Sequence, residues 1–348
     1  MIAKFAILPC ALAVLLGMQA PLQAKELDFA SWGGAYQDGI RKAWIEPFTK
    51  ETGIKVVEDT GPETAKIKAM VSTGSVSWDV VTGGGADLML GAQQGLFEKL
   101  SGLVDESHAF PNARNAYGAP SEIFSTLIGY STKAFPAGGP QPKTFADFWD
   151  VKRFPGKRAL PNSPDTVLEA ALLADGVPAD KVYTTLSTPD GMKRAIAKVR
   201  TLRPDVTIWW SNGAQPVQAL ASGDVVMALG WNGRFQAGID QGLPIAMAWG
   251  QSVAQVGYFM MVKGAPHRDA ALKFLNFIET PEAQSRFSKY VAYGPVTPEA
   301  MPMIDAARAA RLPTTPERMK GALFEDISWW AAHGQAANEA YTAMMQGD

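Results

Sequence analysis

The sequence predicts an α/β protein built from two lobes. Strand-like segments alternate with helical patterns along the whole chain, which is typical of parallel sheets covered by helices. The chain has 348 residues, and chains longer than about 250–300 residues usually divide into two hydrophobic cores. A third observation concerns function: aromatic residues and glycines gather at the ends of several predicted strands.

The N-terminus has the features of a secretory signal peptide. Lys4 is followed by an apolar run of 14 residues at 5–18, and Leu22-Gln23-Ala24 offers a cleavage site before Lys25. A permanent membrane anchor is disfavoured, because a spanning helix needs about 20 apolar residues. We expect residues 1–24 to be removed and the mature protein to reside in the periplasm.

Removal of the signal peptide also limits the chemistry of the mature chain. It takes away Cys10, the only cysteine, and with it any disulfide or thiol. Losing Lys4 changes the net charge from −2 to −3, and no basic stripe remains for nucleic acid. The composition therefore disfavours a nucleic-acid partner.

The first hundred residues contain three strand–helix units. Apolar side chains at Ile40, Ala43, Trp44 and Phe48 recur at steps of three and four, which predicts a helix that ends at Gly53. The expected strands are residues 26–30, 54–57 and 78–81. This helix follows the first strand, a helix at 63–71 follows the second, and a helix that begins near Ala86 follows the third.

The rest of the chain repeats the pattern after prolines at 136, 140 and 142, which mark a change of lobe. Pro281 is expected at the first turn of a helix. Trp329 and Trp330 are expected to pack in a helical C-terminal tail that covers the last fifty residues. The expected strands are 206–208, 225–229 and 256–262, and the expected helices are 166–173, 215–222, 270–278 and 282–290.

Four strand ends carry the candidate binding residues. Each is an aromatic, glycine or polar residue in a turn that offers few neighbours to pack on. The alternative is that the tryptophans fill cores and the glycines form turns. The candidates are Trp32, Gly33 and Gly34; Gly83, Gly84 and Gly85; Trp209, Trp210, Ser211 and Asn212; and Trp231, Asn232 and Arg234.

These candidates suggest two kinds of contact with a ligand. Aromatic faces bind methylene groups and attract cations. Gly83, Gly84 and Gly85, if they open a helix, would present N–H groups suited to an anion, although a plain glycine turn is the alternative.

Several segments resemble the spermidine/putrescine-type extracellular solute-binding proteins, which are components of ABC importers. The resemblance covers nearly the whole mature chain, and its segments occur in the family's order. They are Trp32 after the first strand, PFTKETGIKV at 47–56, WDVV at 78–81, ALASGDV at 219–225, WNG at 231–233 and YGPV at 293–296.

The resemblance implies the two-lobed type II periplasmic binding protein fold. Each lobe would be a mixed, mostly parallel sheet flanked by helices, with the ligand in the cleft between lobes, beyond the strand ends. Chain crossings near 127–131, 256–259 and 295–301 would give lobe 1 residues 25–130 and 257–298, and lobe 2 residues 131–256 and 299–348. The implied partners are a small-molecule ligand, a permease and its ATPase, with a monomeric binding protein and no cofactor.

Arg234 favours a zwitterionic ligand over a plain polyamine. The resemblance implies that polyamine-binding members hold the ammonium groups with acids, and that one of these acids lies on the second crossing strand. This chain has Gly257 and Tyr258 there and no acid. Asp165 could bind an amine and Arg234 a carboxylate, with Tyr258 as a further contact, so we expect an omega-amino acid. Alternatively, Arg234 pairs with an acid across the cleft and Asp165 caps the helix at 166–173, which leaves putrescine or spermidine as the ligand.

Other functional classes have weaker support. The three histidines, His108, His267 and His333, are far apart in sequence and lie in no catalytic or metal-binding motif. A hydrolase using a pair of carboxylates would need two acids that the sequence does not single out. A ferric-ion clamp would need paired tyrosines, whereas Tyr290 and Tyr293 are not adjacent. We therefore expect neither catalysis nor a metal.

Overall fold

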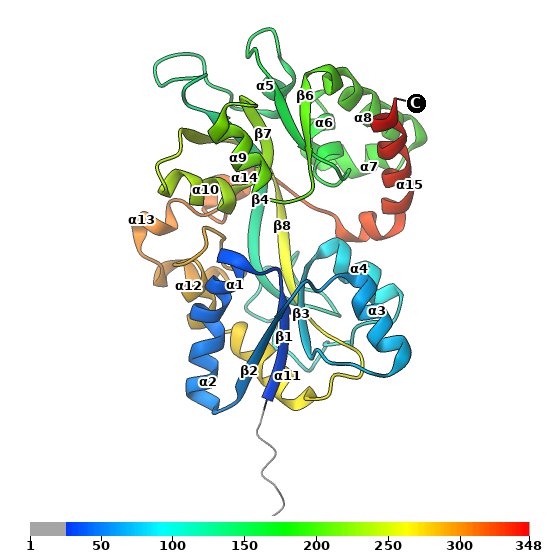
Figure 1. Cartoon of the computed structure of the whole chain (residues 1–348), viewed down its shortest axis with the longest axis vertical. Coiled ribbons are helices and arrows are strands. Elements are labelled where there is room, and N and C mark those ends of the chain that lie inside the picture. Colours follow the sequence, from blue (N-terminus) through cyan, green and yellow to red (C-terminus); the bar gives the residue numbers. More distant parts are fainter. Residues whose placement is uncertain (1–25, 348) are drawn as a thin grey trace, which may run out of the picture.

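The computed structural model describes residues 26–347, in which one mixed sheet of nine strands runs through the molecule (Figure 1). The strand order is β2-β1-β3-β8-β4-β7-β5-β6, and β9 pairs with β8 outside this order. The predicted signal peptide at 1–24 lies outside the described residues.

The lower half in Figure 1 is built on three parallel strands, as predicted. The predicted apolar residues Ile40, Ala43, Trp44 and Phe48 are all fully buried. The strands are β1 (Glu26–Ser31), β2 (Lys55–Thr60) and β3 (Val80–Gly84), and the helices are α1 (Gly34–Ile40), a π-helical turn (Arg41–Ile45), α2 (Glu46–Thr52), α3 (Thr64–Thr73) and α4 (Gly85–Gln93).

Two long antiparallel strands connect the halves. They are β4 (Ala119–Ser131) and β8 (Ile245–Met261), which pair along most of their length. The end of β8 pairs with β3 in the lower half, while β4 pairs with β7 in the upper half. The sequence predicted only the last part of β8, because the polar and glycine residues before it hide the strand pattern.

The upper half has a second set of parallel strands, with β5 between β6 and β7. The helix predicted at 215–222 is confirmed as α9. The strands are β5 (Arg158–Pro161), β6 (Val206–Trp210) and β7 (Met227–Trp231), and the helices are α5 (Phe145–Trp149), α6 (Val167–Ala174), α7 (Val182–Leu186), α8 (Pro189–Leu202), α9 (Gln215–Ser222) and α10 (Asn232–Asp240).

The C-terminal part contains one departure from prediction. Pro281 does lie in the first turn of its helix, but the tail is not wholly helical, because the short strand β9 pairs with β8. The elements are α11 (Arg268–Ile278), α12 (Pro281–Phe287), a 3-10 segment (Pro298–Met303), α13 (Ala306–Ala309), α14 (Pro316–Gly321), β9 (Ala322–Phe324) and α15 (Ile327–Gln346).

The hydrophobic core is divided between the halves. Trp44 stacks on Phe287 in the lower half with ring centroids 4.5 Å apart, whereas Trp329 and Trp330 pack in the upper core, as predicted. Separate cores agree with two lobes joined by the long strands. Within 26–347, none of the helices combines the length and apolar character needed to span a bilayer.

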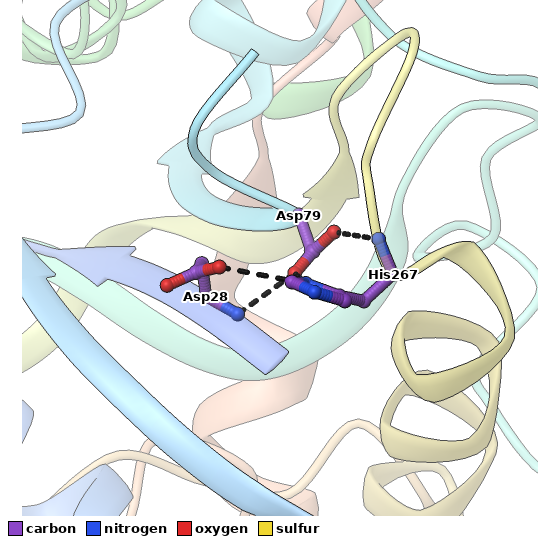
Figure 2. Close-up of side chains that lie close together, drawn as sticks. All are labelled: Asp28, Asp79 and His267. Atoms are coloured by element: carbon purple, nitrogen blue, oxygen red, sulfur yellow. Dashed lines mark hydrogen bonds and ion pairs between the residues drawn. The ribbon is translucent and has the colours of Figure 1, made fainter. Parts of the chain in front are cut away.

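A buried polar cluster joins three segments of the lower half at the beginnings of its strands (Figure 2). Asp79 is fully buried, and its Oδ2 accepts the Asp28 N–H at 2.8 Å and lies 2.9 Å from His267 Nδ1. Its Oδ1 accepts the His267 N–H at 2.6 Å. Burial, followed by the charge of Asp79, raises the pKa of Asp28. Hydrogen bonds thus engage both Asp79 oxygens and tie β1, β3 and the start of α11 together.

We expect Asp79→Ala to lower the free energy of unfolding by about 1–3 kcal/mol, because two backbone N–H groups lose their acceptor. Chemical denaturation measures the change. Asp269→Ala, at an exposed acid in the first turn of α11, is the matched control and should cost no more than about 0.5 kcal/mol. Equal effects from the two substitutions would contradict a structural role for the cluster.

Candidate functional site

A cavity of about 440 Å³ lies between the two halves and is lined by residues from both. It combines aromatic, glycine and acidic residues with a single arginine, and its volume is within the usual range for small-molecule sites. Nine predicted residues line it: Trp32, Gly83, Gly84, Gly85, Asp165, Ser211, Asn212, Trp231 and Arg234.

Four other predicted residues belong to strand and turn structure and do not line the cavity. Gly33 and Gly34, with φ of 66° and 59°, shape the turn that opens α1. Trp209 and Trp210 lie inside β6, which is longer than predicted. Trp210 donates from Nε1 to the Leu229 carbonyl at 2.9 Å. Contact of these four residues with a ligand stays a prediction, since they do not line this cavity.

Asn232 and Tyr258 do not line the cavity either, so their contact with a ligand also stays a prediction. Asn232 is fully buried, where its Oδ1 accepts the Ser125 N–H and its Nδ2 donates to the Ala292 carbonyl. Tyr258 is also buried and donates to the Ala113 carbonyl at 2.9 Å. Both side chains hold the segments that surround the cavity.

Arg234 lies in the first turn of α10, beside Tyr36 and Tyr293. Its charge lowers the pKa of both tyrosines, against the larger raising effect of burial. Within residues 26–347 its guanidinium forms no ion pair or hydrogen bond, so the predicted alternative of a salt bridge across the cleft is not observed. A half-buried guanidinium without a carboxylate is free to bind one from a ligand.

Three acids form another part of the lining: Asp87 in α4, Asp165 before α6 and Glu325 after β9. Burial raises the pKa of each, and repulsion from Asp165 raises the pKa of Asp87 and Glu325 further. Glu325 Oε1 accepts from Gln255 Nε2 at 3.2 Å. Within residues 26–347 no ion pair joins Arg234 to any of these three acids, so the cavity has a cationic part beside Tyr36 and Tyr293 and an acidic part at Asp87, Asp165 and Glu325.

The acidic part makes a ligand anion at the glycine turn less favourable than the sequence predicted. Gly83, Gly84 and Gly85 do lead into α4, but Asp87 Oδ2 accepts the Gly84 N–H at 3.2 Å. A protein carboxyl therefore already occupies the helix start. Because Asp165 and Glu325 lie nearby, a cationic ligand group suits this region.

The position of Asp165 is set by an uncommon backbone conformation. Thr166, which follows it, is the N-cap of α6 and has a φ of 62°, the only positive φ of a non-glycine residue among residues 26–347. No side chain caps α6, so the predicted alternative of Asp165 as the helix cap is not observed. Strained residues of this kind cluster at binding sites, where surrounding structure holds them.

Aromatic side chains come from both halves. Trp231 at the end of β7 packs edge-on against Trp210, with ring centroids 5.5 Å apart, and against Phe124 at 6.2 Å. Trp32 is 49% exposed although it is large and apolar. A ligand carbon chain against Trp32 and Trp231 would remove this surface from water.

Glu122 and Gly257 face each other on the two long strands. Glu122 lies at a β-bulge of β4, where Oε1 accepts from the Tyr36 hydroxyl at 2.6 Å. A Cβ at position 257 would lie 2.3 Å from this oxygen. Glycine on β8 therefore makes room for the carboxyl of Glu122.

Sequence reasoning missed several residues of the lining. Asp87 could have been found as the acid three residues after a glycine N-cap, and the others lie in segments that gave no strand-end signal. The missed residues are Tyr36, Ala86, Asp87, Glu122, Phe124, Gly213, Gln255, Gly257, Tyr293 and Glu325.

Comparisons with known proteins agree with this architecture. The family model for bacterial extracellular solute-binding proteins matches residues 43–314. The gamma-aminobutyric acid-binding protein of Pseudomonas aeruginosa is 38% identical, over 93% of this chain and 92% of that protein. The spermidine/putrescine-binding periplasmic protein of Escherichia coli is 25% identical, over 81% of each.

Two solved structures are also similar. The binding protein MotA of A. tumefaciens B6, in complex with glucopine, has a TM-score of 0.85 and 37% identity, over 92% of this chain and 99% of that one. The Atu4243-GABA receptor has a TM-score of 0.82 and 35% identity, over 93% and 98%. The two-lobed type II fold expected from sequence is thereby confirmed.

We expect Gly257→Ala to destabilise the protein by about 1–3 kcal/mol, because the new methyl group must displace Glu122. Glu122→Ala removes the obstructing carboxyl, so the double substitution should cost less than the sum of the two single ones. Thermal or urea unfolding of the four proteins gives the coupling energy. Strict additivity would show that the two residues do not compete for this space.

Proposed function

This chain belongs to the family of bacterial extracellular solute-binding proteins, and we propose that its ligand is an omega-amino acid of the 4-aminobutyrate type. The observation that carries the proposal is the separation of charge in the cavity. Arg234 offers an unpaired cation, whereas Asp87, Asp165 and Glu325 form a cluster of acids. A ligand with a carboxylate at one end and an ammonium at the other would compensate both.

A plain polyamine fits this cavity less well. Each of its charged groups is an ammonium, so the group that reached Arg234 would meet a like charge, and uncompensated charge in a partly buried site is costly. Sequence similarity also supports an omega-amino acid over a polyamine. The gamma-aminobutyric acid-binding relative is 38% identical to this chain, and the spermidine/putrescine-binding relative is 25% identical. Putrescine and spermidine are the alternative ligands.

The protein serves as the substrate-binding component of an ABC importer. We propose that it closes its two lobes on the ligand and delivers it, as a monomer, to a permease and its ATPase. We also propose that residues 1–24 direct export to the periplasm and are cleaved near Ala24. The lobes would divide as residues 25–130 with 257–298 and 131–256 with 299–348, since β4 and β8 connect the two halves.

Binding without catalysis completes the proposal. His108, His267 and His333 do not line the cavity. Arg234 and the acids of the lining suffice for holding a zwitterion, and we assign them no chemical step. Neither a metal nor a cofactor enters the proposal.

We expect 4-aminobutyrate to stabilise the refolded wild-type protein in a thermal shift assay more than putrescine, spermidine or common amino acids. Arg234→Ala should weaken 4-aminobutyrate binding by about 1.5–3 kcal/mol, the range for a hydrogen bond to a charged group. Isothermal titration calorimetry measures the loss. Arg311→Ala, which removes an exposed arginine paired with Asp240, is the control and should leave affinity unchanged.

Putrescine separates the two ligand classes. If the site is built for a zwitterion, removing the guanidinium should help or not affect putrescine while it harms 4-aminobutyrate. Tight putrescine binding by the wild type, with no binding of 4-aminobutyrate, would contradict the proposed ligand.

Lobe closure is a separate prediction. Because the ligand contacts both halves, 4-aminobutyrate should favour a closed form and reduce the radius of gyration measured by small-angle scattering. A radius that does not change at saturating 4-aminobutyrate would contradict the clamp.

A further inference from the structure

The carboxyl group of Glu122 is an acid of the cavity that the charge pattern above leaves unused. It lines the cavity from β4 and is only 2% exposed. Oε1 accepts from the Tyr36 hydroxyl at 2.6 Å, whereas Oε2 is buried and has no hydrogen-bond partner in the described part of the chain. A buried polar atom left unpaired costs free energy unless a ligand engages it.

We propose that Glu122 is a ligand-binding residue that carries a proton on Oε2 and donates it in a hydrogen bond to the ligand carboxylate, beside Arg234. The inference rests on the proposed function and adds a protonated acid to the proposed binding site. Arg234 would supply the charge, and the neutral acid would supply a donor that only an anionic oxygen satisfies well.

The surroundings of Glu122 favour the protonated form. Tyr36 from α1 and Tyr293 after α12 are the titratable groups beside it, and burial raises the pKa of both, so they are neutral. On β8 it faces the uncharged Gly257 and Gln255. Burial raises the pKa of Glu122 to about 7, and this effect outweighs the neighbouring hydroxyl groups of Ser121 and Tyr36, which lower it.

Arg234 gives an independent geometric argument. It is the cation of this part of the cavity, since its charge acts on both Tyr36 and Tyr293. Nevertheless, no ion pair joins Arg234 to Glu122 within residues 26–347. The guanidinium therefore stays available for a ligand carboxylate in the same part of the cavity as Glu122.

The proposal predicts the sign of a pH effect. If the protonated form binds, affinity is fully present below the Glu122 pKa of about 7 and falls by about tenfold per pH unit above it. Asp87, Asp165 and Glu325 act in the opposite direction, because ionised acids hold an ammonium better. Affinity should therefore rise and then fall as pH increases.

The test is calorimetric titration of 4-aminobutyrate from pH 5.5 to 8.5 with the wild type and three variants. Glu122→Gln keeps a donor that does not titrate, so its affinity should stay within about threefold of the wild type at pH 6, and the alkaline fall should vanish. Glu122→Ala should lose about tenfold or more at pH 6, the usual effect of losing a hydrogen bond to a charged group. Glu279→Gln, at a buried acid outside the cavity, is the control and should keep the wild-type profile.

Infrared difference spectra of the ligand-free protein provide a readout independent of binding. Other buried acids, such as Glu279 and Glu325, whose pKa burial also raises, contribute carbonyl bands to every variant. The spectrum of the wild type minus that of Glu122→Gln at pH 6 should therefore contain one carbonyl band of a protonated acid. A missing band, an alkaline fall that persists in Glu122→Gln, or equal losses in the Gln and Ala variants would overturn the role of Glu122. Failure of 4-aminobutyrate to bind the wild type at any pH would instead contradict the proposed function, and the role of Glu122 with it.

Discussion

Unpaired charge in a partly buried cleft is the constraint on which the account depends. The described chain leaves Arg234 without a carboxylate, while Asp165 is close enough to Asp87 and Glu325 to raise the pKa of both. Either feature alone would be expensive to maintain in a folded protein. Together they form a site whose charges are compensated only when a ligand of matching polarity is bound, which couples ligand identity to lobe closure.

The two long strands make this arrangement possible. β4 and β8 pair through both halves, so side chains on them occupy the floor of the cavity whatever the loops around it do. The bulge at Glu122 turns its carboxyl toward β8, and Gly257 leaves the space it needs. The acid therefore lies where the two strands that connect the halves pair with each other.

Much of the fold followed from the sequence, because its signals are local. The periodicity of Ile40, Ala43, Trp44 and Phe48 predicted the first helical segment, and strand ends correctly directed attention to Trp231 and Arg234. The sequence does not show where β6 ends, so it did not reveal that Trp209 and Trp210 belong to this strand and do not line the cavity. Glu122 and Glu325 were missed because their roles depend on pairing between strands far apart in sequence, β4 with β8 and β8 with β9.

A crystal structure of the protein bound to 4-aminobutyrate would test the central claim most directly. The account predicts one orientation, with the ligand carboxylate on Arg234 and the ammonium among Asp87, Asp165 and Glu325. The carbon chain should lie against Trp32 and Trp231. A ligand bound in the reverse orientation, or an Arg234 that turns to a protein carboxylate and leaves the ligand carboxylate in solvent, would contradict it.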